Sequence, residues 1–131
     1  MTTLYNFCSQ TDCTDGETPI GTLIQDTNGT LYGTTYGGGA YGHGAIFSLS
    51  DGMAPFVEIQ PTSGAVGTAV KILGTNLSSA TEVIFNGTPA TFTVVSSSEI
   101  TTTVPAGATT GTVEVVTQDY TYSSNVPFRV P

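Results

Sequence analysis

The sequence has very little positive charge: two Lys and Arg residues stand against ten Asp and Glu, so the formal net charge at pH 7 is −8 over 131 residues. A surface of this sign repels phosphate groups and anionic lipid headgroups, which argues against nucleic-acid and membrane-surface binding. Long hydrophobic runs are also missing, and no segment approaches the roughly 18 apolar residues of a membrane-spanning helix. We therefore expect no nucleic-acid partner and no membrane insertion.

The side chains that most enzymes rely on are scarce as well. His43 is the only histidine and has no obvious acidic partner in the sequence, and no Gly-x-Ser-x-Gly motif marks a nucleophilic serine. The glycine-rich stretch 33–44 lacks the lysine and the following helix of a phosphate-binding loop, and we interpret it as a tight turn. We expect a protein that is not an enzyme and that needs no cofactor.

Helical periodicity is absent, and short segments of alternating apolar and polar residues recur between turn clusters. This pattern predicts an all-β fold. The composition changes near residues 51–55: both cysteines and the glycine-rich stretch lie before it, and both cationic residues lie after it. We therefore predict two domains, residues 1–52 and 53–131.

The second domain has the pattern of a β-sandwich. We expect seven strands, at residues 56–60, 68–73, 82–85, 90–95, 100–104, 112–117 and 126–130. Asn86-Gly87 predicts a two-residue hairpin turn that joins the third strand to the fourth, because both positions of a type I′ turn need positive φ. The side chains expected to face the core are Val70, Ile72, Val83, Phe85, Phe92, Val94, Ile100, Thr102, Val104, Val113 and Val115.

Residues 55–131 resemble an IPT/TIG domain over nearly the whole family pattern. The match lies in Pro-Thr-Ser-Gly at 61–64, Ile-Leu-Gly-Thr-Asn-Leu at 72–77, Val-Ile-Phe-Asn-Gly-Thr-Pro-Ala at 83–90, Ile-Thr-Thr-Thr-Val-Pro-Ala-Gly at 100–107 and Ser-Asn-Val-Pro-Phe at 124–128. The resemblance implies an immunoglobulin-like sandwich that serves as a structural spacer or interaction module. The family's DNA-binding members use basic loops, which this chain lacks.

Residues 4–50 resemble a single tandem repeat of the GloVer type, found in exported bacterial proteins. The resemblance lies in Phe-Cys-Ser at 7–9, Leu-Tyr-Gly-Thr-Thr at 31–35, the three glycines at 37–39 and Gly-Ala-Ile-Phe at 44–47. It implies a small antiparallel β-meander, similar to one propeller blade, and an extracellular or cell-surface location, with the signal peptide outside this chain. Repeat units of this size normally bury their apolar faces against neighbours, so we expect residues 1–52 not to be self-sufficient.

Cys8 and Cys13 are the only cysteines and are separated by four residues. In an exported protein, a local disulfide is the natural interpretation, and closing a loop of six residues is worth roughly 2 kcal/mol on the chain-entropy model. An intermolecular bridge and free thiols are the alternatives.

Asp12, Asp15 and Glu17 are close enough in sequence to be weak candidates for calcium ligands. Their spacing fits no twelve-residue calcium loop, and an acidic turn beside a disulfide explains them equally well. We therefore expect no metal site.

Five tyrosines are candidates for a protein interface or a glycan contact, because exposed aromatic rings stack on sugars and anchor protein contacts. Three are close together in the first domain and two near the end of the second: Tyr32, Tyr36, Tyr41, Tyr120 and Tyr122. Packing in the core or at a sheet edge is the alternative.

These observations lead to a non-catalytic extracellular structural or interaction module. Because the first domain has unpaired strand edges, we expect it to self-associate through them into an oligomer or fibre. A carbohydrate-binding or adhesion module that contacts polysaccharide through its tyrosines is one alternative. A piece of a longer repeat-array surface protein is the other.

Overall fold

The computed structural model describes residues 1–131 and is built almost entirely of β-strands and loops. Its two short helical segments are 3-10 turns, η1 (Thr11–Cys13) and η2 (Leu77–Ser79). Backbone contacts divide the chain into two compact units, Met1–Met53 and Ala54–Pro131.

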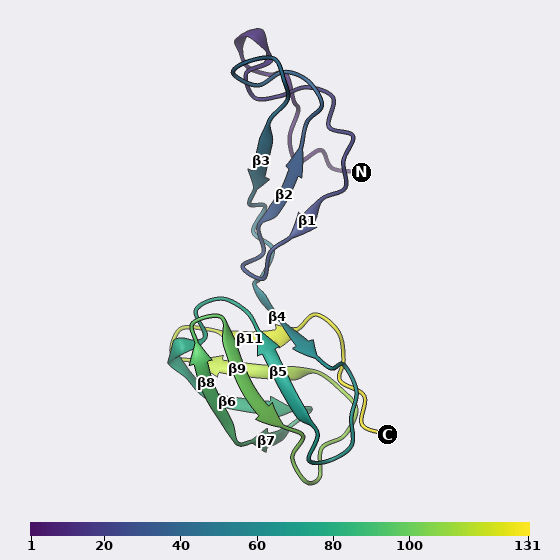
Figure 1. Ribbon diagram of the computed structural model, residues 1–131, viewed down its shortest axis with the longest axis vertical. Helices are drawn as coiled ribbons and strands as arrows, with labels where there is room; N and C mark the ends of the chain where they lie inside the picture. The colour runs from purple at the N-terminus through teal and green to yellow at the C-terminus, as the bar shows by residue number, and fades with distance from the viewer. The chain divides into compact units, whose positions relative to one another are not determined.

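The N-terminal unit, Met1–Met53, contains a three-stranded antiparallel meander, as the sequence predicts. Its strands are β1 (Ile24–Gln25), β2 (Leu31–Thr34) and β3 (Ile46–Leu49), hydrogen-bonded in the order β1-β2-β3 (Figure 1). The glycine-rich stretch forms the connection between β2 and β3, and Gly38 and Gly39 within it adopt positive φ of 69° and 78°. The stretch links two strands, as predicted, but its first two residues belong to β2 and the connection, residues 35–45, is longer than a tight turn.

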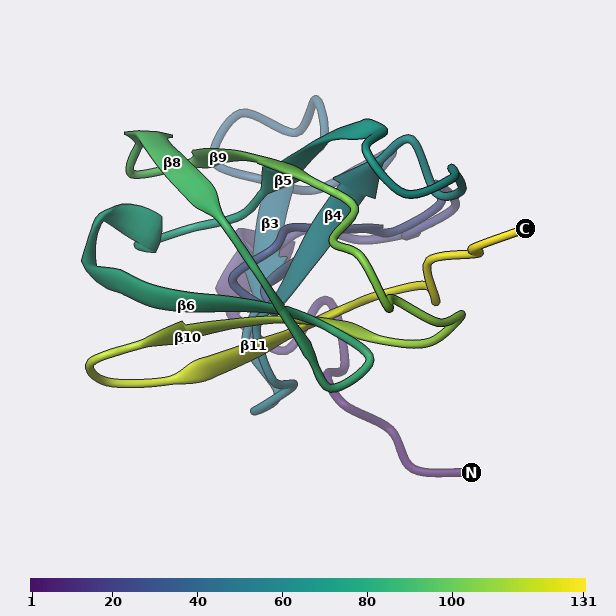
Figure 2. The same ribbon diagram turned by 90° about the horizontal axis from the view of Figure 1, so that it is seen from below.

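The C-terminal unit, Ala54–Pro131, is an immunoglobulin-like sandwich. Its strands are β4 (Phe56–Gln60), β5 (Ala69–Leu73), β6 (Ala80–Phe85), β7 (Thr88–Ala90), β8 (Phe92–Ser96), β9 (Glu99–Thr103), β10 (Val113–Thr117) and β11 (Thr121–Ser124). They form a continuous ladder in the order β7-β6-β10-β11-β4-β5-β9-β8. The parallel pairing of β4 with β11 joins two layers, which Figure 2 shows with β4, β5, β8 and β9 on one side and β6, β10 and β11 on the other.

The core of the sandwich lies between these layers. Fourteen apolar side chains are buried in it, and they come from alternate positions of the strands and from the connecting loops. Nine of the eleven side chains predicted to face inward are buried, and the other two, Phe92 and Val94, are half-buried against the same cluster. At roughly 1.5–3 kcal/mol for each large apolar side chain buried, this core holds the unit together.

The predicted pairing after the Asn86-Gly87 turn is only partly correct. Asn86 and Gly87 have φ of 43° and 87°, as a type I′ turn requires, and Phe85 pairs with Thr88 across it. The paired strand ends at Ala90, however, and Phe92–Ser96 forms a separate strand that pairs with β9. The expected strand 90–95 is therefore wrong, because the chain crosses between the layers after only three paired residues.

The predicted last strand, 126–130, is also wrong. The final strand of the ladder is β11 (Thr121–Ser124), and residues 126–130 contribute only isolated bridges at Phe128 and Arg129. Pro127 has no N–H to donate, which interrupts a regular ladder at this place. The sandwich thus has eight strands where seven are expected.

Candidate functional site

Residues 1–53 contain no buried apolar side chain. All fourteen buried hydrophobic residues lie between Val57 and Phe128, and the buried residues of the N-terminal unit are four glycines and Thr35. Of the fifteen large hydrophobic side chains that are exposed, eleven belong to this unit. Three of these, Ile24, Tyr32 and Ile46, lie in the strands of its sheet, and the apolar residues Leu31, Phe47 and Leu49 of the same sheet are half-buried.

The first face of this sheet is open. Cross-strand pairing places Ile24, Tyr32 and Ser48 in one row and Thr34 beside Ile46 in the next, so these residues share a face. Ile46 is 84% exposed, and Ile24 and Tyr32 are exposed as well. An apolar row with this exposure is a surface suited to contact with another molecule.

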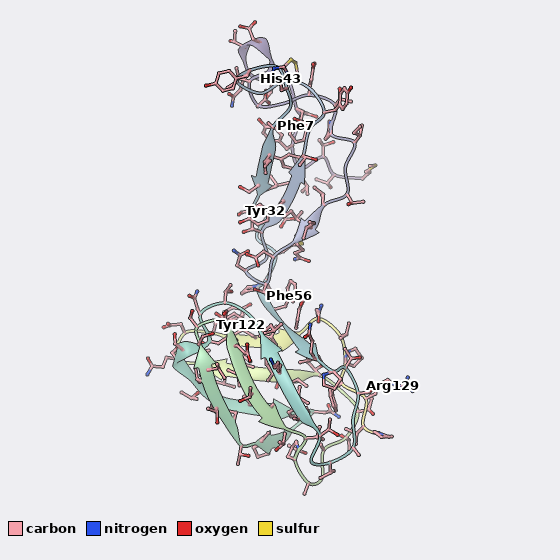
Figure 3. The ribbon with its side chains drawn as sticks, in the orientation of Figure 1. Phe7, Tyr32, His43, Phe56, Tyr122 and Arg129 are labelled. Atoms are coloured by element: carbon pink, nitrogen blue, oxygen red, sulfur yellow. A yellow bond between two sulfur atoms is a disulfide. The ribbon has the colours of Figure 1, made fainter.

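The opposite face carries a shallow groove. Phe47 lies across from Gly33 in the β2–β3 pairing, and its ring occupies the space above that glycine: an added Cβ would lie 2.5 Å from the ring. The ring of Phe7, labelled in Figure 3, packs edge-on against Phe47, with centroids 4.7 Å apart. Tyr5 packs against Phe7 at 5.1 Å.

The resulting groove has a volume of about 640 Å³. Leu4, Tyr5 and Phe7 line it from the N-terminal segment, and Leu23, Phe47 and Leu49 line it from the region of the sheet. No charged side chain contributes to it. Its surface therefore suits an uncharged, apolar contact.

Strand β3 is an edge of this sheet. It pairs with β2 on one side, and no backbone hydrogen bond joins it to another segment on the other side. Ile46, Phe47, Ser48 and Leu49 carry no charge and include no proline. Charged side chains and proline protect an edge strand from pairing with another strand, and because β3 has neither, its edge is open to such pairing.

The five candidate tyrosines differ in exposure. Tyr36 and Tyr41 are the most exposed, at 78% and 89%, and Tyr32 and Tyr120 are exposed to about 40%. Tyr122 is 6% exposed and belongs to the core, because it pairs with Val115 and points between the layers (Figure 3). Its prediction as a surface contact is corrected: Tyr122 packs inside the sandwich.

The disulfide between Cys8 and Cys13 is present. Its sulfurs and a carboxylate oxygen of Glu17 lie within 4.8 Å of one another, but disulfide sulfurs are not the thiolates that bind metal ions. Asp12 and Asp15 do not join Glu17 in a group of this kind, so the three acids are not brought together as calcium ligands.

Asp15 has a structural position in this loop. Its carboxylate accepts hydrogen bonds from the Tyr5 hydroxyl at 2.8 Å, the Ser9 hydroxyl at 2.9 Å and the Ser9 N–H at 3.0 Å. Desolvation acts to raise the pKa of Asp15, but the hydrogen bonds from Ser9, Tyr5 and Gln10 outweigh it and lower the pKa from 3.8 to about 2. The carboxylate therefore ties Tyr5 to the disulfide loop.

The sequence singles out Tyr32 and the cysteines but not Phe7, Phe47 or Ile46, which form much of the apolar surface. The opposition of Gly33 and Phe47 in adjacent strands is the one signal that could identify the groove, because an aromatic ring across from a strand glycine typically packs over it. His43 is exposed. No helix is both long and apolar enough to traverse a lipid bilayer.

Comparison with known proteins gives one family and a distant structural neighbour. The family model described as IPT/TIG domain matches residues 56–130. An auxiliary nutrient binding protein from Bacteroides ovatus is similar over 58% of this chain, with 25% sequence identity and a TM-score of 0.48, and the match spans 20% of that protein. No curated protein matches the chain.

Proposed function

The chain belongs to the IPT/TIG domain family through residues 56–130, and from this premise we propose that it is a non-catalytic extracellular interaction module that self-associates through its N-terminal unit. The sandwich is the folded support, as in a spacer domain. Residues 1–53 supply the contact surface, and the edge of β3 pairs with a strand of a second copy.

The observation that carries this proposal is the absence of any buried apolar side chain in residues 1–53. Apolar surface removed from water stabilises by roughly 25 cal/mol per Å², so a sheet that exposes such surface gains free energy when another molecule covers it. The unpaired edge of β3 supplies backbone donors and acceptors for an added strand. Both features favour a partner that adds a strand, and in our proposal a second copy of the chain supplies it.

The proposed contact surface itself carries no acidic side chain. The five acidic residues of the unit are Asp12, Asp15, Glu17, Asp26 and Asp51, and none lies in β3 or lines the groove. Repulsion between exposed charges is screened beyond about 8 Å at physiological ionic strength. The acids therefore leave an uncharged surface free for pairing.

The N-terminal unit also fits a single propeller-type repeat. A three-stranded antiparallel meander without a core of its own is what one repeat of an array contributes, since repeats bury their apolar surface against neighbours. In the proposed assembly, further copies of the chain supply those neighbours. Pairing of this kind closes into a ring or continues as a filament.

The disulfide supports the extracellular part of the proposal. Structural disulfides form and persist mainly in oxidising environments such as the bacterial periplasm and the cell exterior. The Cys8–Cys13 bond lies in the unit that we propose as the contact surface, where the lack of buried apolar side chains makes covalent support most useful.

Light scattering coupled to size exclusion tests the proposal. The intact chain is expected to give a mass above 13.5 kDa that rises with protein concentration. Ile46→Lys places a charge on the β3 edge and is expected to return the mass to that of the monomer. Val95→Lys is the matched control, because Val95 is also an exposed β-branched residue on an edge strand, but in the sandwich.

The control is expected to keep the wild-type mass. A monomeric wild-type chain at every concentration would contradict self-association. If both variants lost mass equally, the contact between copies would lie in the sandwich or be nonspecific, and the proposed role of the β3 edge would be wrong.

Polysaccharide binding is a second candidate function. Tyr36 and Tyr41 are the most exposed aromatic residues of the chain, and their sequence neighbours are glycine, alanine and threonine. Exposed rings with small uncharged neighbours are suited to stacking on sugar rings. For this function, we expect a gel that contains the polysaccharide to retard the wild-type protein. The retardation is expected to be lost in Tyr36→Ala and in Tyr41→Ala and to be kept in Tyr120→Ala.

A further inference from the structure

The Cys8–Cys13 disulfide lies directly after the segment that forms one part of the groove. Residues 4–7, here called the strap, contribute Leu4, Tyr5 and Phe7 to the groove lining. Phe7 immediately precedes the first cysteine and packs against Phe47 of β3 with ring centroids 4.7 Å apart. The position of the first cysteine therefore constrains where the strap lies.

The loop closed by the disulfide has an unfavourable backbone conformation. Cys8, Asp12 and Cys13 adopt positive φ of 59°, 56° and 51°, a region that residues other than glycine rarely enter. Three such residues in a six-residue loop need support from covalent or tertiary contacts. The disulfide is one such support, and the hydrogen bonds to Asp15 are another.

The segment after the loop is attached independently of the disulfide. The carbonyl of Cys13 accepts hydrogen bonds from the Gly16 N–H at 2.8 Å and the Gly39 N–H at 3.0 Å, and Glu17 and Gly37 exchange two backbone hydrogen bonds. Before the loop, by contrast, the Cys8 N–H donates to Gly16 at 2.9 Å, and residues 1–7 make no backbone hydrogen bond. The strap also has two non-covalent attachments, the Tyr5 hydroxyl, which donates to Asp15 at 2.8 Å, and the contact of Phe7 with Phe47. Cleavage of the disulfide removes the covalent tie to the anchored segment, so it is expected to loosen the strap and to leave the segment that follows in place.

We infer that the Cys8–Cys13 disulfide is a redox-sensitive clip that holds the strap against Phe47, so that the groove exists in the oxidised protein and opens in the reduced one. A dithiol reductant supplies the two electrons and two protons. The sulfur–sulfur bond breaks, Cys8 and Cys13 become thiols, and the reductant becomes a disulfide. The clip acts on the groove whether or not the β3 edge binds a second copy.

Nuclear magnetic resonance of the intact chain tests this at a concentration where light scattering gives the monomer. In the oxidised protein, a nuclear Overhauser contact between the Phe7 and Phe47 rings and slow exchange of the Cys8 and Ser9 amides are expected. With dithiothreitol, we expect the ring contact to disappear and these two amides to exchange roughly ten- to fortyfold faster, the range that closure of a six-residue loop provides. Removal of the reductant in air is expected to restore both signals.

The Glu17 and Gly39 amides and those of β2 and β3 are expected to keep their protection. The double variant Cys8→Ser, Cys13→Ser is expected to match the reduced protein and to be insensitive to dithiothreitol. Persistence of the Phe7–Phe47 contact and of the Cys8 and Ser9 protection after reduction would overturn the inference. Loss of protection throughout β2 and β3 would overturn it too, because the disulfide would then stabilise the whole sheet and not the strap.

Discussion

At the scale of single residues, Asp15 shows how one carboxylate organises a loop without acting in catalysis or metal binding. Its oxygens accept hydrogen bonds from Tyr5, Ser9 and Gln10, which connect the strap to the far side of the disulfide loop. These donors stabilise the charged form, which is why its pKa is lowered to about 2. An acidic residue that resembles a calcium ligand in sequence is thus a hydrogen-bond acceptor for its own loop.

The lowered pKa predicts the acid sensitivity of the strap. Because the pKa of Asp15 is below its ordinary value of 3.8, the carboxylate stabilises the folded loop fully above pH 4 and progressively less as the pH falls toward 2. In an NMR titration, the Ser9 amide shift is expected to change with a midpoint near pH 2. Asp15→Asn is expected to abolish that change, and a midpoint at or above pH 3.8 in the wild type would contradict the role given to these hydrogen bonds.

At the scale of elements, the strands could be predicted where apolar and polar residues alternate regularly. They could not be predicted where the chain crosses from one layer of the sandwich to the other. Val70 and Ile72 lie on either side of the polar Lys71 and are buried as expected. The separation of β7 from β8 leaves no local signal, because Thr91 between them resembles a strand residue as much as a bend residue. Such a crossing is decided by which layer offers the better-packed place for Phe92, a tertiary effect.

The candidate site was predictable to a smaller extent. Alternation assigns Tyr120 and Tyr122 to the same side of the chain, but it does not say whether that side is the core, and Tyr122 is buried. The disulfide follows from the number and spacing of the cysteines. The contact between Phe7 and Phe47 joins residues forty positions apart, so no local sequence pattern predicts it. It could be inferred only after the strand register that places Phe47 opposite Gly33 is known.

At the scale of the whole molecule, stability is divided unequally between the two units. All fourteen buried apolar side chains belong to the C-terminal unit, whereas the N-terminal unit has a short sheet, one disulfide and a set of loop hydrogen bonds. Regions with few buried apolar contacts open at low free energy, well below global unfolding. The self-association proposed above would stabilise residues 1–53, because binding that favours the folded form shifts its equilibrium.

Native-state hydrogen exchange tests this division of stability. In monomeric Ile46→Lys, the amides of β2 are expected to exchange at least about a hundredfold faster than those of β10, because no partner covers the N-terminal sheet. In the wild-type chain, protection of β2 is expected to rise with protein concentration, whereas protection of β10 stays constant, since only the N-terminal unit gains from assembly. Equal protection of β2 and β10 in a dilute monomer would show that residues 1–53 are stable alone, and the physical reason for self-association would be lost.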